Sequence, residues 1–255
     1  MNTAAFARTE LLLGEQAVER LATAHVAIFG LGGVGSFAAE GLVRSAVGRL
    51  TLVDHDVVGE TNLNRQAMAL RSTIGQSKVV ALRHRLLDIN PEAVVNLREV
   101  FYRPELAQEF DFADFDYVID AIDTVRAKVD LAVQAQRHGV RLISCMGMGN
   151  RIDPTQVRLG DLSQTDTCPL CRAMRKKLRR QGIESLPVVY SLETPLPVPK
   201  IRFEDERCSA KRPTPGSIVF VPATAGMALA SAVVRGLLGL SPAGHLGGKA
   251  ERAES

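Results

Sequence analysis

The glycine-rich stretch Gly30-Leu31-Gly32-Gly33-Val34-Gly35 constrains the fold of this chain more than any other feature. It follows an apolar run that ends at Phe29, and the residues after it can continue as a helix. Gly30, Gly32 and Gly35 have the G-x-G-x-x-G spacing of a nucleotide-binding strand–turn–helix. Such glycines let the backbone approach phosphates, and the helix N-terminus presents unpaired N–H groups to negative charge. By itself the pattern also fits a structural turn or an NAD site.

Strand and helix patterns alternate around this loop. Short apolar runs predict strands at 26–29, 50–53, 94–97, 117–123 and 140–145, and helical periodicity predicts helices at 77–90 and 124–138. This alternation predicts an α/β fold with a doubly wound, Rossmann-like, mostly parallel sheet and helices on both faces. Asp54 and Asp123 then lie at the carboxyl edge of the sheet, where such folds bind ligands. Asp54 follows the loop by roughly 20 residues, the spacing of a ribose-binding acid.

The pattern changes after about residue 150. We expect a strand at 155–159, a basic helix at 168–181, and an extended or mobile loop at 187–215, which holds six prolines. A strand at 217–221 and a helix from about Ala223 complete the prediction. The expected organisation is a single domain over 1–240, with the basic helix and a proline-rich crossover segment at 166–216, and a disordered tail at 241–255.

Composition indicates a soluble globular protein, with 46% hydrophobic and 23% charged residues. The formal net charge of +3 does not by itself indicate a nucleic-acid binder. Four cysteines without a signal-like N-terminus favour the cytoplasm. The apolar stretch 218–240 approaches the ~20 residues of a membrane span. Because Pro222 divides it, we expect a buried core helix and no stable membrane insertion.

Three further blocks, combined with the glycine loop and Asp54, resemble the E1-like adenylating enzymes. They are Thr-Asn-Leu-Asn-Arg-Gln at 61–66, Gly-Gln-Ser-Lys at 75–78 and Asp-Ala-Ile-Asp at 120–123. An NAD dehydrogenase would share the glycines but would not require these blocks. The superfamily activates carboxylates with ATP, and includes ubiquitin-like activating enzymes and adenylyltransferases for sulfur-carrier proteins.

Within that superfamily, the blocks 8–14, 118–128 and 149–155 resemble the tRNA threonylcarbamoyladenosine dehydratases. The resemblance implies an enzyme that uses ATP to cyclise N6-threonylcarbamoyladenosine at position 37 of tRNA. The threonyl carboxylate would attack the α-phosphorus of ATP and release pyrophosphate. The tethered carbamoyl group would then attack the acyl-adenylate and expel AMP, an intramolecular step whose orientation contributes up to ~7–11 kcal/mol.

Two other functions remain open at this point. The first is adenylation of the C-terminal Gly-Gly of a ubiquitin-like sulfur carrier, and the second is a nucleotide-binding scaffold without turnover. A sulfur-relay partner is not identified by any motif. Against the scaffold stand three charged residues that pseudoenzymes commonly lose, namely Arg65, Lys78 and Asp123.

The resemblance also implies a role for individual residues. The expected catalytic set is Arg65, Lys78, Asp123 and Arg8. ATP would be bound by Gly30, Gly32, Gly33, Gly35, Asp54, Asn62, Arg65 and Lys78. Asp123 matches the residue associated with Mg²⁺, a cation that prefers oxygen ligands. Arg8 matches an arginine that reaches the ATP of the other subunit, which implies a homodimer; its alternative is an ordinary surface arginine.

The strongest charge cluster comprises Arg172, Arg175, Lys176, Lys177, Arg179 and Arg180. Such a cluster can bind tRNA phosphates in a salt-dependent, largely sequence-independent way. The alternative is a solvated helix face. Given the substrate that the resemblance implies, we favour tRNA binding.

The cysteines are assigned less firmly. Cys168 and Cys171 have C-x-x-C spacing, but a structural zinc site normally needs four ligands, and Cys145 and Cys208 are isolated in the sequence. We therefore assign no zinc site there, and zinc binding by this pair stays an open alternative. Cys208 lies roughly where thioester-forming relatives keep a catalytic cysteine. Because the cyclisation needs no thiolate, we interpret it as an incidental loop cysteine.

Overall fold

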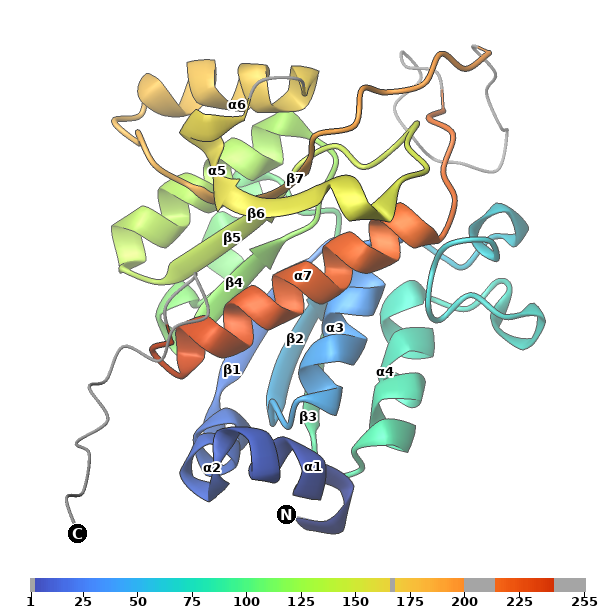
Figure 1. Ribbon diagram of the computed structural model, residues 1–255, viewed down its shortest axis with the longest axis vertical. Coiled ribbons are helices and arrows are strands. Elements are labelled where there is room, and N and C mark those ends of the chain that lie inside the picture. The colour runs from blue at the N-terminus through green and yellow to red at the C-terminus, as the bar shows by residue number, and fades with distance from the viewer. Residues whose placement is uncertain (1–2, 166–167, 200–213, 241–255) are drawn as a thin grey trace, which may run out of the picture.

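A computed structural model describes residues 3–165, 168–199 and 214–240. Within these residues, seven strands form one sheet in the order β3-β2-β1-β4-β5-β7-β6 (Figure 1). The strands are β1 His25–Phe29, β2 Arg49–Val53, β3 Val94–Arg98, β4 Tyr117–Asp120, β5 Arg141–Cys145, β6 Val157–Asp161 and β7 Pro187–Ser191. All neighbours pair in parallel except β6 and β7. The predicted doubly wound, mostly parallel α/β fold is therefore confirmed.

Helices cover both faces of this sheet. They are α1 Thr3–Leu13, α2 Glu15–Thr23, α3 Gly35–Arg44, α4 Lys78–Ile89, α5 Val125–His138, α6 Pro169–Arg179 and α7 Phe220–Leu237. Side chains of a strand alternate between faces. In β1, Val26 and Ile28 pack with α3, α4 and α7, whereas Ala27 and Phe29 pack with α5 and α6. The two resulting hydrophobic cores hold the loops at the carboxyl edge in place from both sides.

The predicted strand at 217–221 is wrong. Residues 214–218 form neither helix nor strand, and α7 begins at Phe220, so that Pro222 lies in its first turn. A proline is tolerated there because the first N–H groups of a helix have no intrahelical partner. By length and composition α7 passes as a membrane span, but 56% of it is buried. It packs along α3 (Figure 1), as the predicted core helix does.

The expected proline-rich loop is also partly wrong. Its first residues form β7, inserted between β5 and β6 (Figure 1). Val188 and Val189 are fully buried there, and Pro187 occupies the first strand position, where the missing N–H is tolerated. Residues 192–199 form no helix or strand. Cys208 and the tail 241–255 lie outside the described residues, so the single-domain organisation with a disordered tail stays a prediction.

Candidate active site

Two glycines of the loop are required by the fold itself. Gly30 has a φ of 90°, and a Cβ there would lie 2.7 Å from the carbonyl oxygen of Ala121. A Cβ on Gly35 would lie 1.8 Å from the carbonyl oxygen of Gly30. Gly32 differs, because its Cβ would meet no atom within 4 Å. The open space at Gly32, beside the N-terminus of α3, is where a phosphate group can approach the backbone.

Asp54 follows β2 and is hydrogen-bonded to the glycine loop. Its Oδ2 accepts the N–H of Leu31 at 2.6 Å, and its Oδ1 accepts the N–H of Asp56 at 2.9 Å. A carboxylate has about four acceptor positions, so these bonds leave capacity for ribose hydroxyls. The structure therefore places Asp54 next to the glycine loop, as the sequence predicts.

Lys78 is buried at the start of α4, where a cation is unfavourable against the helix dipole. Asp56 compensates for this charge. Its Oδ2 accepts from Lys78 Nζ at 3.0 Å, and its carbonyl oxygen accepts from the Lys78 N–H at 2.9 Å. Asp56 was not assigned a role from the sequence. Asp56 lies two residues beyond Asp54. The same turn therefore contains Asp54, the expected ribose ligand, and the partner of Lys78, the expected phosphate ligand.

The block around Arg65 forms a turn stabilised by its own hydrogen bonds. Asn62 is buried, and its Oδ1 accepts the N–H of Gly59 at 3.1 Å. Arg65 Nη1 donates to the carbonyl oxygen of Thr61 at 2.7 Å. A Cβ on Gly33 would lie 3.1 Å from the carbonyl oxygen of Arg65, so this turn packs directly against the glycine loop. Asn62 thus stabilises the turn, and the turn places Arg65 next to the glycine loop.

Asp123 is exposed and lies beyond the end of β4, which stops at Asp120 rather than at residue 123 as predicted. The turn between them is fixed, because the N–H of Ala121 donates to the carbonyl oxygen of Phe29 at 2.8 Å. This bond sets the turn beside Gly30. Asp123 therefore lies exposed at the same edge of the sheet as the loop.

A buried ion pair supports this turn and was missed in the sequence. Lys128 Nζ donates to Asp120 Oδ2 at 2.9 Å, to Ser144 Oγ at 3.1 Å and to the carbonyl oxygen of Cys145 at 2.7 Å. Both charged side chains are fully buried. Asp120 Oδ1 also accepts the N–H of Ile122 at 3.1 Å. The available signal was a lysine on the helix face that periodicity assigns to the core.

Arg151 was likewise missed as an individual residue. It is buried, and its guanidinium donates to the carbonyl oxygens of Gly147 at 2.7 Å, Gly149 at 3.0 Å and Glu193 at 3.0 Å. These bonds hold the loop that follows β5 against the segment that follows β7. Arg151 therefore shapes the far side of the carboxyl edge.

Arg8 is not brought to the glycine loop of its own chain. It is exposed on α1, whose Phe6 packs with Val18 and with Ala46, just beyond the C-terminal end of α3. The glycine loop lies at the opposite end of α3. Any contact between Arg8 and a nucleotide would therefore have to be with a second chain.

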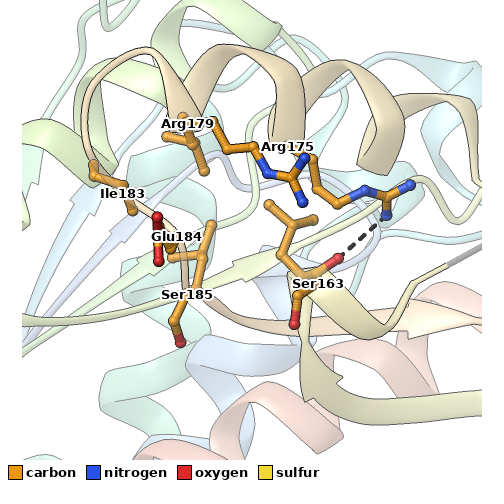
Figure 2. A pocket seen from close by; sticks show the side chains of 9 residues that line it. Ser163, Arg175, Arg179, Ile183, Glu184 and Ser185 are labelled. Carbon is orange, nitrogen blue, oxygen red and sulfur yellow. Dashed lines mark hydrogen bonds between the residues drawn. The ribbon is translucent and has the colours of Figure 1, made fainter.

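The basic cluster lies on α6 and its C-cap Arg180, with Arg175 in a different position from the rest. Arg172, Lys176, Lys177, Arg179 and Arg180 are exposed. Arg175 is partly buried and donates to the carbonyl oxygen of Leu162 at 3.2 Å (Figure 2) and to Thr165. It borders a cavity of about 10 Å³ with Arg179, Ser163 and Ser185 (Figure 2). Arg175 thus anchors α6 to the protein, and the other five cations remain accessible.

Similarity to known proteins agrees with this geometry. Residues 6–249 match the ThiF family. The tRNA threonylcarbamoyladenosine dehydratase of Bacillus subtilis is 43% identical over 239 residues, which are 91% of this chain and 94% of that protein. The Escherichia coli protein of the same name is 41% identical over 174 residues, 68% of this chain and 65% of that protein.

A solved structure extends the similarity over nearly the whole fold. The crystal structure of the E. coli dehydratase TcdA in complex with ATP aligns with a TM-score of 0.83 at 33% identity. The alignment covers 93% of this chain and 95% of that one. The chain therefore belongs to the ThiF family, and within it to the group of the tRNA threonylcarbamoyladenosine dehydratases.

Proposed function

We propose that this protein uses ATP to cyclise N6-threonylcarbamoyladenosine in tRNA. The observation that carries the proposal is the convergence at one edge of the sheet of a glycine loop open at Gly32, the acid Asp54 and the cations Arg65 and Lys78. A relative similar over 94% of its own length is a tRNA threonylcarbamoyladenosine dehydratase, and TcdA binds ATP. These similarities favour this function over activation of a sulfur carrier.

ATP would lie across the carboxyl edge of the sheet. Backbone N–H groups at the start of α3 face its phosphates, and Asp54 accepts from its ribose. The carboxylate that attacks the α-phosphorus and the phosphate itself are both anionic. Arg65 and the Nζ hydrogens that Lys78 does not donate to Asp56 would stabilise the charge that develops between them.

Mg²⁺ is the cation that this chemistry implies, and the donor set fits it. Magnesium is usually held by one or two carboxylates together with substrate phosphates. Asp123 provides an exposed carboxylate beside the loop. Bound there, the ion would neutralise phosphate charge. Asp123 would hold it, and Lys128 would fix the turn through Asp120.

No protein nucleophile is required for the second step. The carbamoyl nitrogen is already tethered to the activated carbonyl, so the protein needs only to orient the two groups and exclude water. The three described cysteines, Cys145, Cys168 and Cys171, are buried and are assigned no part in it.

The tRNA and the second subunit complete the proposal. The five exposed cations of α6 would bind tRNA phosphates. In a homodimer, Arg8 of one subunit would reach the nucleotide of the other. The predicted location is the cytoplasm, where cysteines are kept as thiols.

One experiment tests the proposed function. Purified protein is incubated with ATP, Mg²⁺ and tRNA that carries the linear nucleoside, and nucleosides and AMP are measured by mass spectrometry. We expect a product lighter by one water, formed together with AMP and abolished in Asp123→Ala and Arg65→Ala. Arg71→Ala, at an exposed arginine of the following turn, is the matched control and should retain turnover. Absence of the water loss, together with pyrophosphate exchange that depends on a carrier protein, would instead establish the alternative.

A further inference from the structure

The pair Cys168 and Cys171 stands at the beginning of α6, outside the proposed ATP site. Cys168 is the N-cap residue, with extended backbone angles, and Cys171 lies in the first turn of the helix. Side chains three residues apart at a helix start are neighbours, and the two thiols here interact directly. Both thiols are free and buried, and Cys168 retains 4% exposure. The geometry therefore allows an intramolecular disulfide.

The surroundings of the two sulfur atoms are unequal. The neighbouring Cys171 thiol holds the pKa of Cys168 below its ordinary range, against the effect of burial. The backbone N–H groups of Cys171, Gly147 and Leu170 act in the same direction. Its interaction with Cys168 and its burial raise the pKa of Cys171. The N-terminus of an 11-residue helix adds partial positive charge at Cys168.

Cys145 provides a contrast within the same protein. It is also buried, but it is the last residue of a strand, β5, and burial raises its pKa to about 12. The thiolate is the reactive form of cysteine, so we expect Cys145 to react more slowly than Cys168.

A metal site does not account for this pair in the described part of the chain. Structural zinc takes four ligands. Among residues 3–165, 168–199 and 214–240, the group of three or more ligating side chains close enough to share an ion is Asp54, His55 and Asp56, which does not include either cysteine.

We propose that Cys168 and Cys171 form a redox-active dithiol that a hydroperoxide oxidises to a disulfide. The Cys168 thiolate attacks one peroxide oxygen and displaces hydroxide, which yields a sulfenic acid. The sulfur of Cys171 then attacks the Cys168 sulfur and releases water. In sum, two thiols and one hydrogen peroxide give one disulfide and two waters. Cys168 is the reacting thiol, and Cys171 resolves the intermediate.

The test follows the thiols by mass spectrometry and does not depend on dehydratase activity. The full-length protein is treated with hydrogen peroxide, the remaining thiols are alkylated, and the peptide 159–172 is analysed. We expect this peptide to become lighter by two hydrogen atoms and to escape alkylation, with dithiothreitol reversing both changes. Cys145 should react at least ~10-fold more slowly because little of it is thiolate.

Two variants separate the roles of the cysteines. In Cys171→Ser, dimedone should trap a sulfenic acid at Cys168, whereas in Cys168→Ser, Cys171 should stay reduced at the same dose. Cys145→Ser is the matched control and should behave like the wild type. Double alkylation of the treated wild-type peptide, oxidation of Cys145 at an equal rate, or one zinc ion per chain in the purified protein would each overturn the proposal.

Discussion

Replacing Lys128 by methionine tests whether the buried ion pair holds the edge of the sheet together. The substitution keeps an unbranched side chain but removes the ammonium group. Asp120 keeps its bonds from Ser144 and from the N–H of Ile122, but its carboxylate loses its cation while remaining fully buried. Ser144 and the carbonyl oxygen of Cys145 each lose a donor as well.

The magnitude follows from these losses. Removing one partner of a buried pair costs about 3–5 kcal/mol, because an uncompensated charge remains in the interior. A domain is typically stable by about 5–15 kcal/mol, so Lys128→Met should lower the urea midpoint severely without changing the slope. Far-UV circular dichroism is the suitable probe, since the chain has no tryptophan.

A double-mutant cycle completes the test. Asp120→Asn combined with Lys128→Met removes both charges, so the double variant should be more stable than the sum of the single losses by at least about 2 kcal/mol. Arg126→Met, at an exposed position of α5 that pairs with Glu105 on the surface, is the matched control and should change stability little. A loss below about 1 kcal/mol for Lys128→Met, or strictly additive single losses, would refute the reasoning.

Three further predictions concern the loop, pH and tRNA. Gly32→Ala should fold normally but weaken ATP binding in calorimetry at least ~10-fold, since its methyl group fills only the space offered to phosphate. Gly35→Ala should instead lower the melting temperature. Equal ATP affinity for Gly32→Ala and the wild type would contradict this assignment. Burial lowers the pKa of His25 in the folded protein, so on acidification the unfolded chain binds a proton at a higher pH than the folded one. The free energy of unfolding should therefore fall as the pH drops below the ordinary pKa of about 6.5. Melting temperatures measured from pH 7.5 to 5.5 should show this fall, and His25→Asn should give a flatter curve. Arg172→Gln should weaken tRNA binding and reduce the slope of log affinity against log salt concentration by about 1. An unchanged slope would show that Arg172 does not contact tRNA. Arg175→Gln should instead destabilise the protein, because Arg175 bonds to Leu162 and Thr165.

Local signals were sufficient for much of the fold and of the nucleotide site. The strands β1 and β2 and the helices α4 and α5 lie where periodicity predicts them, because burial of one face imposes a regular spacing on apolar residues. Gly30 and Gly35 were identifiable because a strand–turn–helix that approaches its own backbone so closely leaves no room for a Cβ. Asp54 follows from the same topology, since parallel strands end at one edge.

Other features depend on contacts between segments far apart in the chain. The residues 187–191 do not by themselves predict that this segment pairs with β5 and β6. The pairing depends on burial of Val188 and Val189 between those two strands. Likewise, the spacing of charges does not reveal that Lys128 meets Asp120 in the interior, or that Arg175 turns back to a carbonyl oxygen while Arg172 faces solvent. The sequence by itself determined which residues are candidates for nucleotide binding, because glycine loops and strand ends are local. Only the tertiary structure decided which charges remain available to a ligand, because a charge is neutralised by whichever partner packing brings within hydrogen-bond distance.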